Sequence, residues 1–211
     1  MKDIYVIGSG GFAKEVFFLL QETKRYNVLG FVDINTELRS ICIDSVHYQI
    51  FSEEEIKKDK NVSVAIGIGD PKIISRIVGK YASVFDFPNI IHPNVVGNWN
   101  SIKIGKGNII CSNVNFTLDI QIGSFNVFNL SATVGHDSRI GDCNVINPTA
   151  CISGGVVINN NVLIGANSTI LQYRKIGDNA IVGAGAVVLN DIPENETWVG
   201  NPAKKNERKS K

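Results

Sequence analysis

The sequence lacks the features that mark several large classes of protein. Its 211 residues carry 21 basic and 20 acidic side chains, so no excess of one charge suggests a nucleic-acid or anionic-membrane partner. No apolar run approaches the roughly 18 residues that span a bilayer, and the short apolar start is too brief for a signal peptide. Because 44% of the residues are hydrophobic, we expect a globular cytoplasmic protein without membrane insertion.

Cysteine and histidine are also scarce. The four cysteines form no CxxC pair and no spacing typical of a metal site, so we predict no metal ion and buried or half-buried reduced thiols at Cys42, Cys111, Cys143 and Cys151. Of the three histidines, His47 lies in a polar connector and is expected at the surface. His92 precedes a proline and is expected to have a local structural role. His136 is left as the candidate for acid–base chemistry.

Up to about residue 88 the sequence alternates between strand and helix patterns. Runs rich in β-branched residues predict strands at 4–7, 28–32 and 62–66, and apolar residues at helical spacing predict helices at 13–23 and 73–78. This alternation predicts an α/β unit in which helices pack on a parallel sheet.

After residue 88 a six-residue period replaces that alternation. Every sixth position is aliphatic or phenylalanine over fifteen consecutive steps, from Ile104 to Val188, and glycine often follows. This pattern predicts an all-β solenoid in which each hexad supplies one short strand with its apolar residue turned inward. The alternative is an ordinary sandwich with accidental spacing.

The repeat resembles the left-handed parallel β-helix of the hexapeptide acyltransferases, over roughly residues 90–204. It closes with VGNPAK at 199–204, similar to a segment that ends the helix in many members. Three earlier segments, GSGGFAKEV at 8–16, GFVD at 30–33 and AIGIGDPK at 65–72, resemble one branch of that family. The branch contains bacterial nucleotide-sugar N-acetyltransferases that act on 4-amino sugars, and sialic acid O-acetyltransferases.

The resemblance implies two domains and an assembly. Residues 1–88 are expected to form a Rossmann-like nucleotide-sugar-binding domain, and residues 89–211 a left-handed β-helix acetyltransferase domain. Family members associate as homotrimers with active sites between subunits, so the same is expected here.

A strand followed by GSGGFA and a helix presents backbone N–H groups to a phosphate. We therefore predict that Gly8, Ser9, Gly10 and Gly11 bind the diphosphate of a nucleotide sugar, and that Asp33 accepts hydrogen bonds from its ribose or base. An NAD site and a purely structural glycine turn are the alternatives, although the segment is too short for two mononucleotide-binding halves. The family loop often carries histidine where this chain has phenylalanine at position 12.

A second polar turn follows the third predicted strand. Its Gly67, Asp70 and Lys72 fall at the same carboxyl edge of the sheet as the glycine loop, where open α/β sheets bind ligands. We predict that these residues contribute to the substrate site, with Lys72 directed at a phosphate. A solvated turn without a ligand is the alternative.

His136 lies at a predicted corner inside the repeat, followed by Asp137. Histidine suits removal of a proton from an amine that attacks a thioester, and a neighbouring carboxylate fixes its tautomer. The resemblance places the family's catalytic base at this position; a purely structural histidine is the alternative. Relatives often carry a second histidine nine residues later, where this chain has Val145.

The resemblance also implies three hexads per coil, so that residues 18 apart stack. Gly154 is then placed directly over His136, where its N–H is expected to face outward and serve as the oxyanion donor. Ala166 and Ala184 share another column, and we predict that both, with Gly154, contact acetyl-CoA. Lys204 and the basic residues that follow it, Lys205, Arg208, Lys209 and Lys211, are expected to attract the 3′-phosphate of the coenzyme or to form a solvated tail.

These expectations combine into one predicted activity. The chain is predicted to transfer acetyl directly from acetyl-CoA to the amino group of a UDP- or dTDP-linked 4-amino-deoxysugar. O-acetylation of sialic acid or another sugar hydroxyl is one alternative, and a non-catalytic trimeric binding scaffold is a second.

Overall fold

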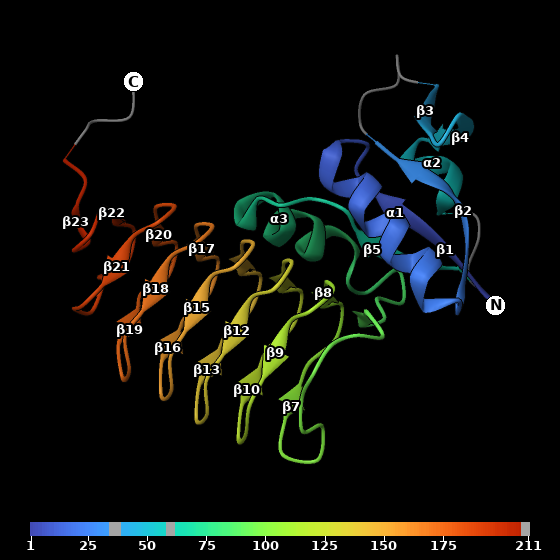
Figure 1. The fold of residues 1–211 in the computed structure, drawn as a ribbon. Coiled ribbons are helices and arrows are strands. Elements are labelled where there is room, and N and C mark those ends of the chain that lie inside the picture. Colours follow the sequence, from blue (N-terminus) through green and yellow to red (C-terminus); the bar gives the residue numbers. More distant parts are fainter. Residues whose placement is uncertain (34–38, 58–61, 208–211) are drawn as a thin grey trace.

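The computed structural model describes residues 1–33, 39–57 and 62–207. An α/β unit at the N-terminus lies beside one end of a long solenoid, which extends away from it to the C-terminus (Figure 1). No helix among these residues is long and apolar enough to cross a bilayer.

The N-terminal sheet has five strands in the order β3-β4-β2-β1-β5. Strands β1, β2, β4 and β5 pair in parallel, whereas β3 and β4 form an antiparallel hairpin. The three predicted strands and two predicted helices are confirmed; the hairpin and the short helix α2 were not predicted. The elements are β1 Lys2–Ile7, α1 Gly11–Thr23, β2 Tyr26–Val32, β3 Ser40–Ile43, β4 Val46–Phe51, α2 Glu53–Ile56, β5 Ser63–Ile66 and α3 Pro71–Tyr81. His47 is exposed, as expected, but it belongs to β4 and not to a connector.

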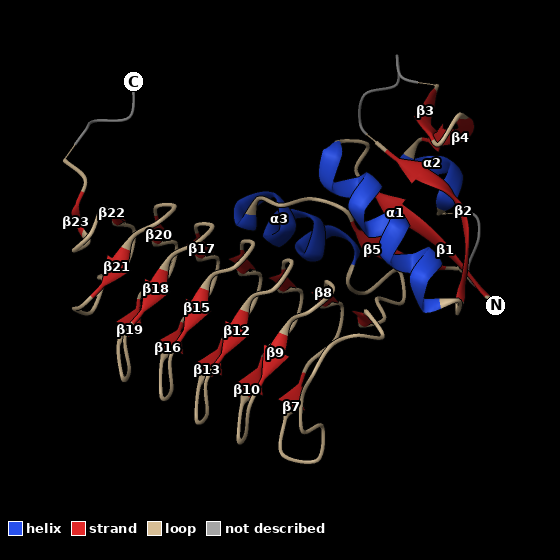
Figure 2. Ribbon diagram, in the orientation of Figure 1, coloured by secondary structure: helices blue, strands red, loops and turns tan. Residues whose placement is uncertain are grey.

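Strands of two residues, or three in β22, build the solenoid, and they form three sheets along its length that are parallel except for the last pair, β22 and β23 (Figure 2). Strands pair with those 18 residues away, for example Gln121 with Arg139 and Thr133 with Cys151, so three hexads complete one coil. The predicted period and coil are therefore confirmed. The strands are β6 Ile90–Ile91, β7 Lys103–Ile104, β8 Ile109–Ile110, β9 Asn115–Phe116, β10 Gln121–Ile122, β11 Val127–Phe128, β12 Thr133–Val134, β13 Arg139–Ile140, β14 Val145–Ile146, β15 Cys151–Ile152, β16 Val157–Ile158, β17 Leu163–Ile164, β18 Thr169–Ile170, β19 Lys175–Ile176, β20 Ile181–Val182, β21 Val187–Val188, β22 Thr197–Val199 and β23 Lys204–Lys205.

The inward side chains of the solenoid are almost all apolar. Of the fifteen positions at six-residue spacing, only Ile104 is half-buried and the others are buried. One interior column is polar: Asn126 and Asn144 are fully buried, and each donates from its amide to the asparagine 18 residues earlier. The side-chain oxygens of these asparagines also accept backbone N–H groups of the next coil. Because every step of this ladder is paired, it helps to hold the register between coils.

The two parts of the chain share a buried cluster. Helix α1 contacts β6, and the outward-facing Ile109, Val127 and Val145 of the solenoid belong to the same cluster as α1 residues such as Leu19. Val145, at the position of the family's second histidine, is 1% exposed. A hydrophobic contact between the parts therefore occupies that position.

The cysteine prediction is wrong in part. Cys42 and Cys151 are exposed, because both occupy strand positions whose side chains point outward. Cys111 and Cys143 are buried as expected, and burial raises the pKa of Cys111 to about 12 and that of Cys143 to about 11. All four thiols are free.

Two adjacent residues of β13 test the inward-facing assignment. Ile140→Ala should lower the free energy of unfolding by about 2–5 kcal/mol, because it leaves a cavity in the solenoid core. Arg139→Ala, on the exposed side of the same strand, should change it by less than about 0.5 kcal/mol. Urea denaturation measures both; equal losses would contradict the predicted alternation.

Candidate functional site

The His136 side chain projects from the solenoid and is 51% exposed. Its Nδ1 lies 2.7 Å from Oδ2 of Asp137. Because an ionised carboxylate only accepts hydrogen bonds, Nδ1 carries the proton and donates it. The neutral imidazole then keeps its lone pair on Nε2, which is available to take a proton from a ligand.

Gly154 stacks over this imidazole, as the 18-residue spacing predicts. A Cβ at residue 154 would lie 2.5 Å from Nε2 of His136, so only glycine lets the ring occupy this position. The turn is held from both sides, since the Gly155 N–H donates to the His136 carbonyl at 2.7 Å and the Tyr173 N–H to the Gly154 carbonyl at 3.1 Å. Gly154 is buried, and its own N–H donates to no acceptor among the described residues.

The three corners of the solenoid differ in whether their backbone N–H groups have hydrogen-bond acceptors. On one corner, the N–H groups of Ser124, Asp142 and Asn160 donate to side chains one coil further on, at 2.6–2.9 Å. At the matching positions of the other two corners, the described residues offer no such acceptor to the N–H groups of Gly154, Ala166 and Ala184. Ala166 is half-buried and Ala184 is exposed. Among the described residues these amides are therefore left without a hydrogen-bond acceptor.

Lys204 is exposed in β23, which pairs antiparallel with β22 at the end of the solenoid far from the α/β unit (Figure 1). Lys205 beside it forms an ion pair with Glu196. Of the basic tail, Arg208, Lys209 and Lys211 lie outside the described residues.

The glycine loop joins β1 to α1. Gly8 has a φ of +109°, its N–H donates to the Val32 carbonyl at 2.8 Å, and a Cβ on it would lie 2.9 Å from the Gly67 carbonyl oxygen. Gly10 and Gly11 begin α1, and a Cβ on either would meet nothing within 4 Å. The Ser9 hydroxyl donates to Oδ2 of Asp33. The structure thus brings Gly8–Gly11 and Asp33 together at the N-terminus of a helix, where an anion is favoured.

In the second predicted turn, which contains Gly67, Asp70 and Lys72, two residues have structural roles. Gly67 is buried, and a Cβ on it would lie 2.7 Å from the Cα of Ala13, so it lets α1 pack on the sheet. Asp70 is the N-cap of α3, with Oδ1 accepting from the N–H groups of Lys72 at 2.8 Å and Ile73 at 3.1 Å. The Asp-Pro sequence at the start of this helix is a capping signal that could have been read. The Lys72 side chain is exposed.

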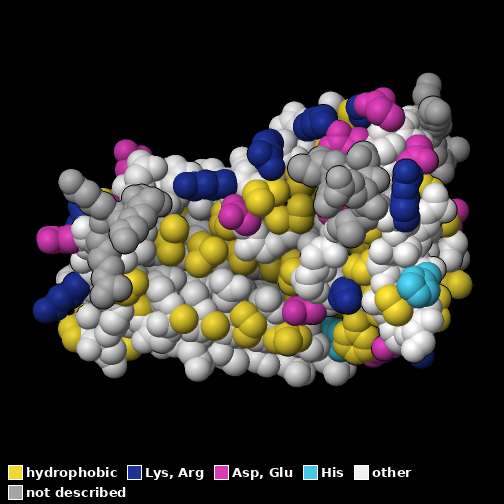
Figure 3. All heavy atoms as spheres, turned by 90° about the horizontal axis from the view of Figure 1, so that it is seen from above, with side chains coloured by type: hydrophobic (Ala, Val, Ile, Leu, Met, Phe, Trp, Pro, Cys, Tyr) yellow, Lys and Arg dark blue, Asp and Glu magenta, His cyan; other side chains and the backbone are white. Residues whose placement is uncertain are grey.

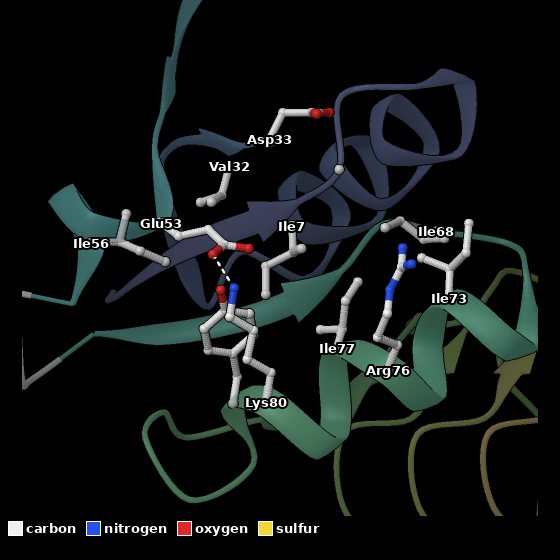
Figure 4. Close-up of a pocket in the computed structure, with 12 residues that line it drawn as sticks. Ile7, Val32, Asp33, Glu53, Ile56, Ile68, Ile73, Arg76, Ile77 and Lys80 are labelled. Atoms are coloured by element: carbon white, nitrogen blue, oxygen red, sulfur yellow. Dashed lines mark hydrogen bonds and ion pairs between the residues drawn. The ribbon is translucent and has the colours of Figure 1, made fainter. Parts of the chain in front are cut away.

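A cavity of about 250 Å³ adjoins the glycine loop. Five isoleucines and a valine form its apolar wall, Gly8 and Asp33 border it, and four further polar residues line it: Glu53, Arg76, Lys80 and Tyr81 (Figure 4). Sequence reasoning missed these four. Three of them project from α3, and Arg76 and Lys80 share a helical face with Ile73 and Ile77, a spacing that could have indicated a common lining.

An ion pair joins Glu53 of α2 to Lys80 of α3 at one end of this cavity, and Arg76 lies at the other end (Figure 4). This hydrogen bond raises the pKa of Lys80. The hydroxyl of Tyr81 is buried beside Glu53 and Lys80 and makes no hydrogen bond of good geometry among the described residues. Burial, and then the nearby Glu53 carboxylate, raise the pKa of Tyr81, so its hydroxyl stays protonated.

Two family descriptions match parts of the chain. Residues 3–81 match the PglD N-terminal domain, and residues 155–190 match the bacterial transferase hexapeptide (six repeats). No curated protein sequence matches the chain.

Several solved structures resemble nearly the whole chain. PerB from Caulobacter crescentus, in complex with CoA and GDP-perosamine, is 26% identical with a TM-score of 0.88, covering 98% of each chain. The acetyltransferase domain of PglB from Neisseria gonorrhoeae, in complex with acetyl coenzyme A, is 26% identical with a TM-score of 0.86, covering 97% of this chain and 99% of its own. WeeI from Acinetobacter baumannii is 27% identical with a TM-score of 0.83, covering 98% and 100%. These similarities confirm the predicted fold.

Two substitutions in the glycine loop test which glycine is required by the backbone conformation. Gly8→Ala should destabilise the protein by about 1–3 kcal/mol, because its φ is positive and its Cβ would press on the Gly67 carbonyl. Gly10→Ala, with ordinary φ and open space, should change stability by less than about 1 kcal/mol. Thermal unfolding compares the two; a Gly8→Ala variant as stable as Gly10→Ala would contradict the described loop.

Proposed function

The chain belongs to the hexapeptide-repeat acyltransferases, and on that premise we propose that it transfers acetyl from acetyl-CoA to the amino group of a nucleotide-linked amino sugar. The single observation that carries the proposal is the imidazole of His136 lying against Gly154, with Nδ1 held by Asp137. That arrangement sets a base beside an unused amide N–H. N-acetylation of an amine by a thioester needs both groups at one point.

In the proposed mechanism the sugar nitrogen attacks the thioester carbonyl directly. Nε2 of His136 takes the proton that the nitrogen loses, and Asp137 holds the imidazole in the tautomer with a free Nε2 lone pair. The Gly154 N–H donates to the carbonyl oxygen as negative charge develops on it. Collapse of the tetrahedral intermediate breaks the C–S bond, the sulfur leaves with a proton as the CoA thiol, and no acyl-enzyme forms.

We place acetyl-CoA along the open amides of the solenoid. The N–H groups of Ala166 and Ala184 have no side-chain acceptor in the described part of the chain, in contrast to those on the third corner, and both side chains are small enough for a pantetheine arm to approach. Lys204 is proposed to meet the 3′-phosphate. CoA and acetyl-CoA bound to the Caulobacter and Neisseria structures support a coenzyme site on this fold.

We propose that the chain divides into domains at residues 1–88 and 89–211. The nucleotide binds the first of these, the α/β unit. Gly8, Ser9, Gly10 and Gly11 would meet the diphosphate at the start of α1, and Asp33 the ribose; Lys72 is exposed near the same edge. Gly67 and Asp70 would support this site through packing and capping. The nucleotide-sugar complex of the Caulobacter relative supports this assignment.

We also propose that the protein is a homotrimer and that it acts in the cytoplasm. Hydrophobic side chains gather over a long stretch of the solenoid (Figure 3), and its corners expose Leu118, Leu130, Leu171, Tyr173 and Leu189. Association of three copies would cover such a surface. It would also bring the Ala166 and Ala184 column of one copy toward the His136 of the next.

Substitution of the base tests the mechanism. His136→Ala should lower the rate of acetyl transfer by about 10²–10⁴-fold, because the proton acceptor is lost. Asp137→Asn should also lower it, through loss of the tautomer control. His47→Ala, an exposed histidine of β4, is the matched control and should act like wild type. Thiol release from acetyl-CoA measures each rate; full activity of His136→Ala would exclude His136 as the base.

The acceptor is tested separately, since O-acetylation of a sugar hydroxyl uses the same base. Purified protein is offered acetyl-CoA with UDP-, dTDP- and GDP-linked 4-amino sugars and with free sialic acid. We expect turnover of a nucleotide-linked amine. Turnover of sialic acid alone would establish the O-acetyltransferase, and turnover of no acceptor, with binding retained, would favour a non-catalytic scaffold.

A further inference from the structure

The cavity beside the glycine loop has a size that limits its occupant. Its volume of about 250 Å³ is below the roughly 300–1,000 Å³ of sites that enclose a whole drug-sized ligand. It therefore fits one part of a nucleotide sugar. Because the sugar amine must reach His136 on the solenoid, the part that enters the cavity is the base, with the ribose at Asp33 and the diphosphate at the glycine loop.

The walls of the cavity suit a flat heteroaromatic ring. Ile7 and Val32 come from the ends of β1 and β2, and Ile73 and Ile77 from α3, so apolar side chains line it from the sheet and from the helix (Figure 4). Such walls accept any base equally. Discrimination must come from the polar groups at the end where Glu53 and Lys80 lie.

Those polar groups are the Glu53–Lys80 ion pair and the buried Tyr81 hydroxyl. Glu53 is the first residue of α2, whose start is fixed by a capping box between Ser52 and Glu55, and its side chain is only 25% exposed. Tyr81 is 3% exposed and lines the cavity, and its hydroxyl lies beside the Glu53 carboxylate and the Lys80 ammonium. The three polar groups therefore gather at one place in the cavity, where they can meet the edge of a ligand ring.

We propose that this end of the cavity reads guanine, so that the substrate is a GDP-linked amino sugar and not the UDP- or dTDP-linked one expected from the sequence. The base-pairing edge of guanine presents two adjacent donors, N1–H and N2–H₂, beside the O6 acceptor. The Glu53 carboxylate accepts from the two donors, and the Lys80 ammonium donates to O6. The Tyr81 hydroxyl supplies a third polar contact.

The other bases do not match this row of groups. Uracil and thymine place carbonyl oxygens on both sides of their single N3–H, so a carboxylate would face two acceptors. Adenine and cytosine place a ring-nitrogen lone pair where guanine has N1–H. A site that hydrogen-bonds one edge of a base binds less tightly an analogue whose donors and acceptors do not match it.

The proposal rests on the nucleotide-sugar function proposed above, and wild-type binding separates the two. Calorimetric titration of the full chain with GDP, IDP, UDP and dTDP should show GDP binding at least about tenfold more tightly than UDP or dTDP, the scale of a bidentate base contact. IDP, which lacks only the 2-amino group, should bind more weakly than GDP. Binding of none of the four would overturn the nucleotide-sugar function; tighter binding of UDP or dTDP would overturn only the guanine assignment.

A substitution that reverses the base preference tests whether Glu53 accepts the hydrogen bonds from guanine. Glu53→Gln should weaken GDP binding by about tenfold or more and should bind xanthosine diphosphate more tightly than GDP, because the new amide donates to the oxygen that xanthine carries in place of the 2-amino group. Glu54→Gln is the matched control, since Glu54 is 80% exposed on the same helix and should keep the wild-type order. A Glu53→Gln variant that keeps that order would contradict the proposal. If it fails to fold, the GDP and IDP comparison on wild type decides.

Discussion

The hydrogen bonds between stacked coils are the constraint on which the rest of this structure depends. From β7 to β21 they place each strand residue over the one 18 positions earlier, so the partner of a given position can be read from the sequence. The apolar column inside the solenoid and the paired asparagines at its corner hold that register. This register places the amide of Gly154 next to the imidazole of His136.

The same register decides which backbone groups are free. Side chains of one corner accept the N–H groups of the preceding coil, and glycine and alanine at the other two corners do not. A solenoid of uniform hexads would satisfy or expose all three corners alike. The difference between corners gives a repetitive scaffold directed hydrogen-bond donors, one at the corner of His136 and others at the corner of Ala166 and Ala184.

The α/β unit contributes a second, separate set of donors and acceptors. Gly8 turns the chain between β1 and α1, and Gly67 lets the helix approach the sheet, so the N-terminus of α1 stands beside Asp33. The buried cluster that joins α1 to the outward face of β8, β11 and β14 ties this unit to the solenoid. The proposed nucleotide site and the proposed acetyl-transfer site therefore belong to parts of one packed body.

The sequence was informative where local pattern and contact coincide. The six-residue period predicted the solenoid, and the resemblance supplied the coil length that set Gly154 against His136. It was uninformative where contacts join distant segments: Glu53 and Lys80 are 27 residues apart, and nothing local in either segment indicates the other. Cys42 and Cys151 were misassigned for a related reason, because composition does not say which face of a strand a residue occupies. The Asp-Pro pair could have indicated that Asp70 caps α3, and this capping role was not predicted.

The most direct test of the central claim is a crystal structure with CoA and a nucleotide-linked amino sugar bound together. The account predicts the sugar nitrogen within hydrogen-bonding distance of Nε2 of His136 and the pantetheine sulfur beside Gly154. A complex in which the sulfur lies at the corner of Ser124 and Asp142, away from the imidazole, would contradict it.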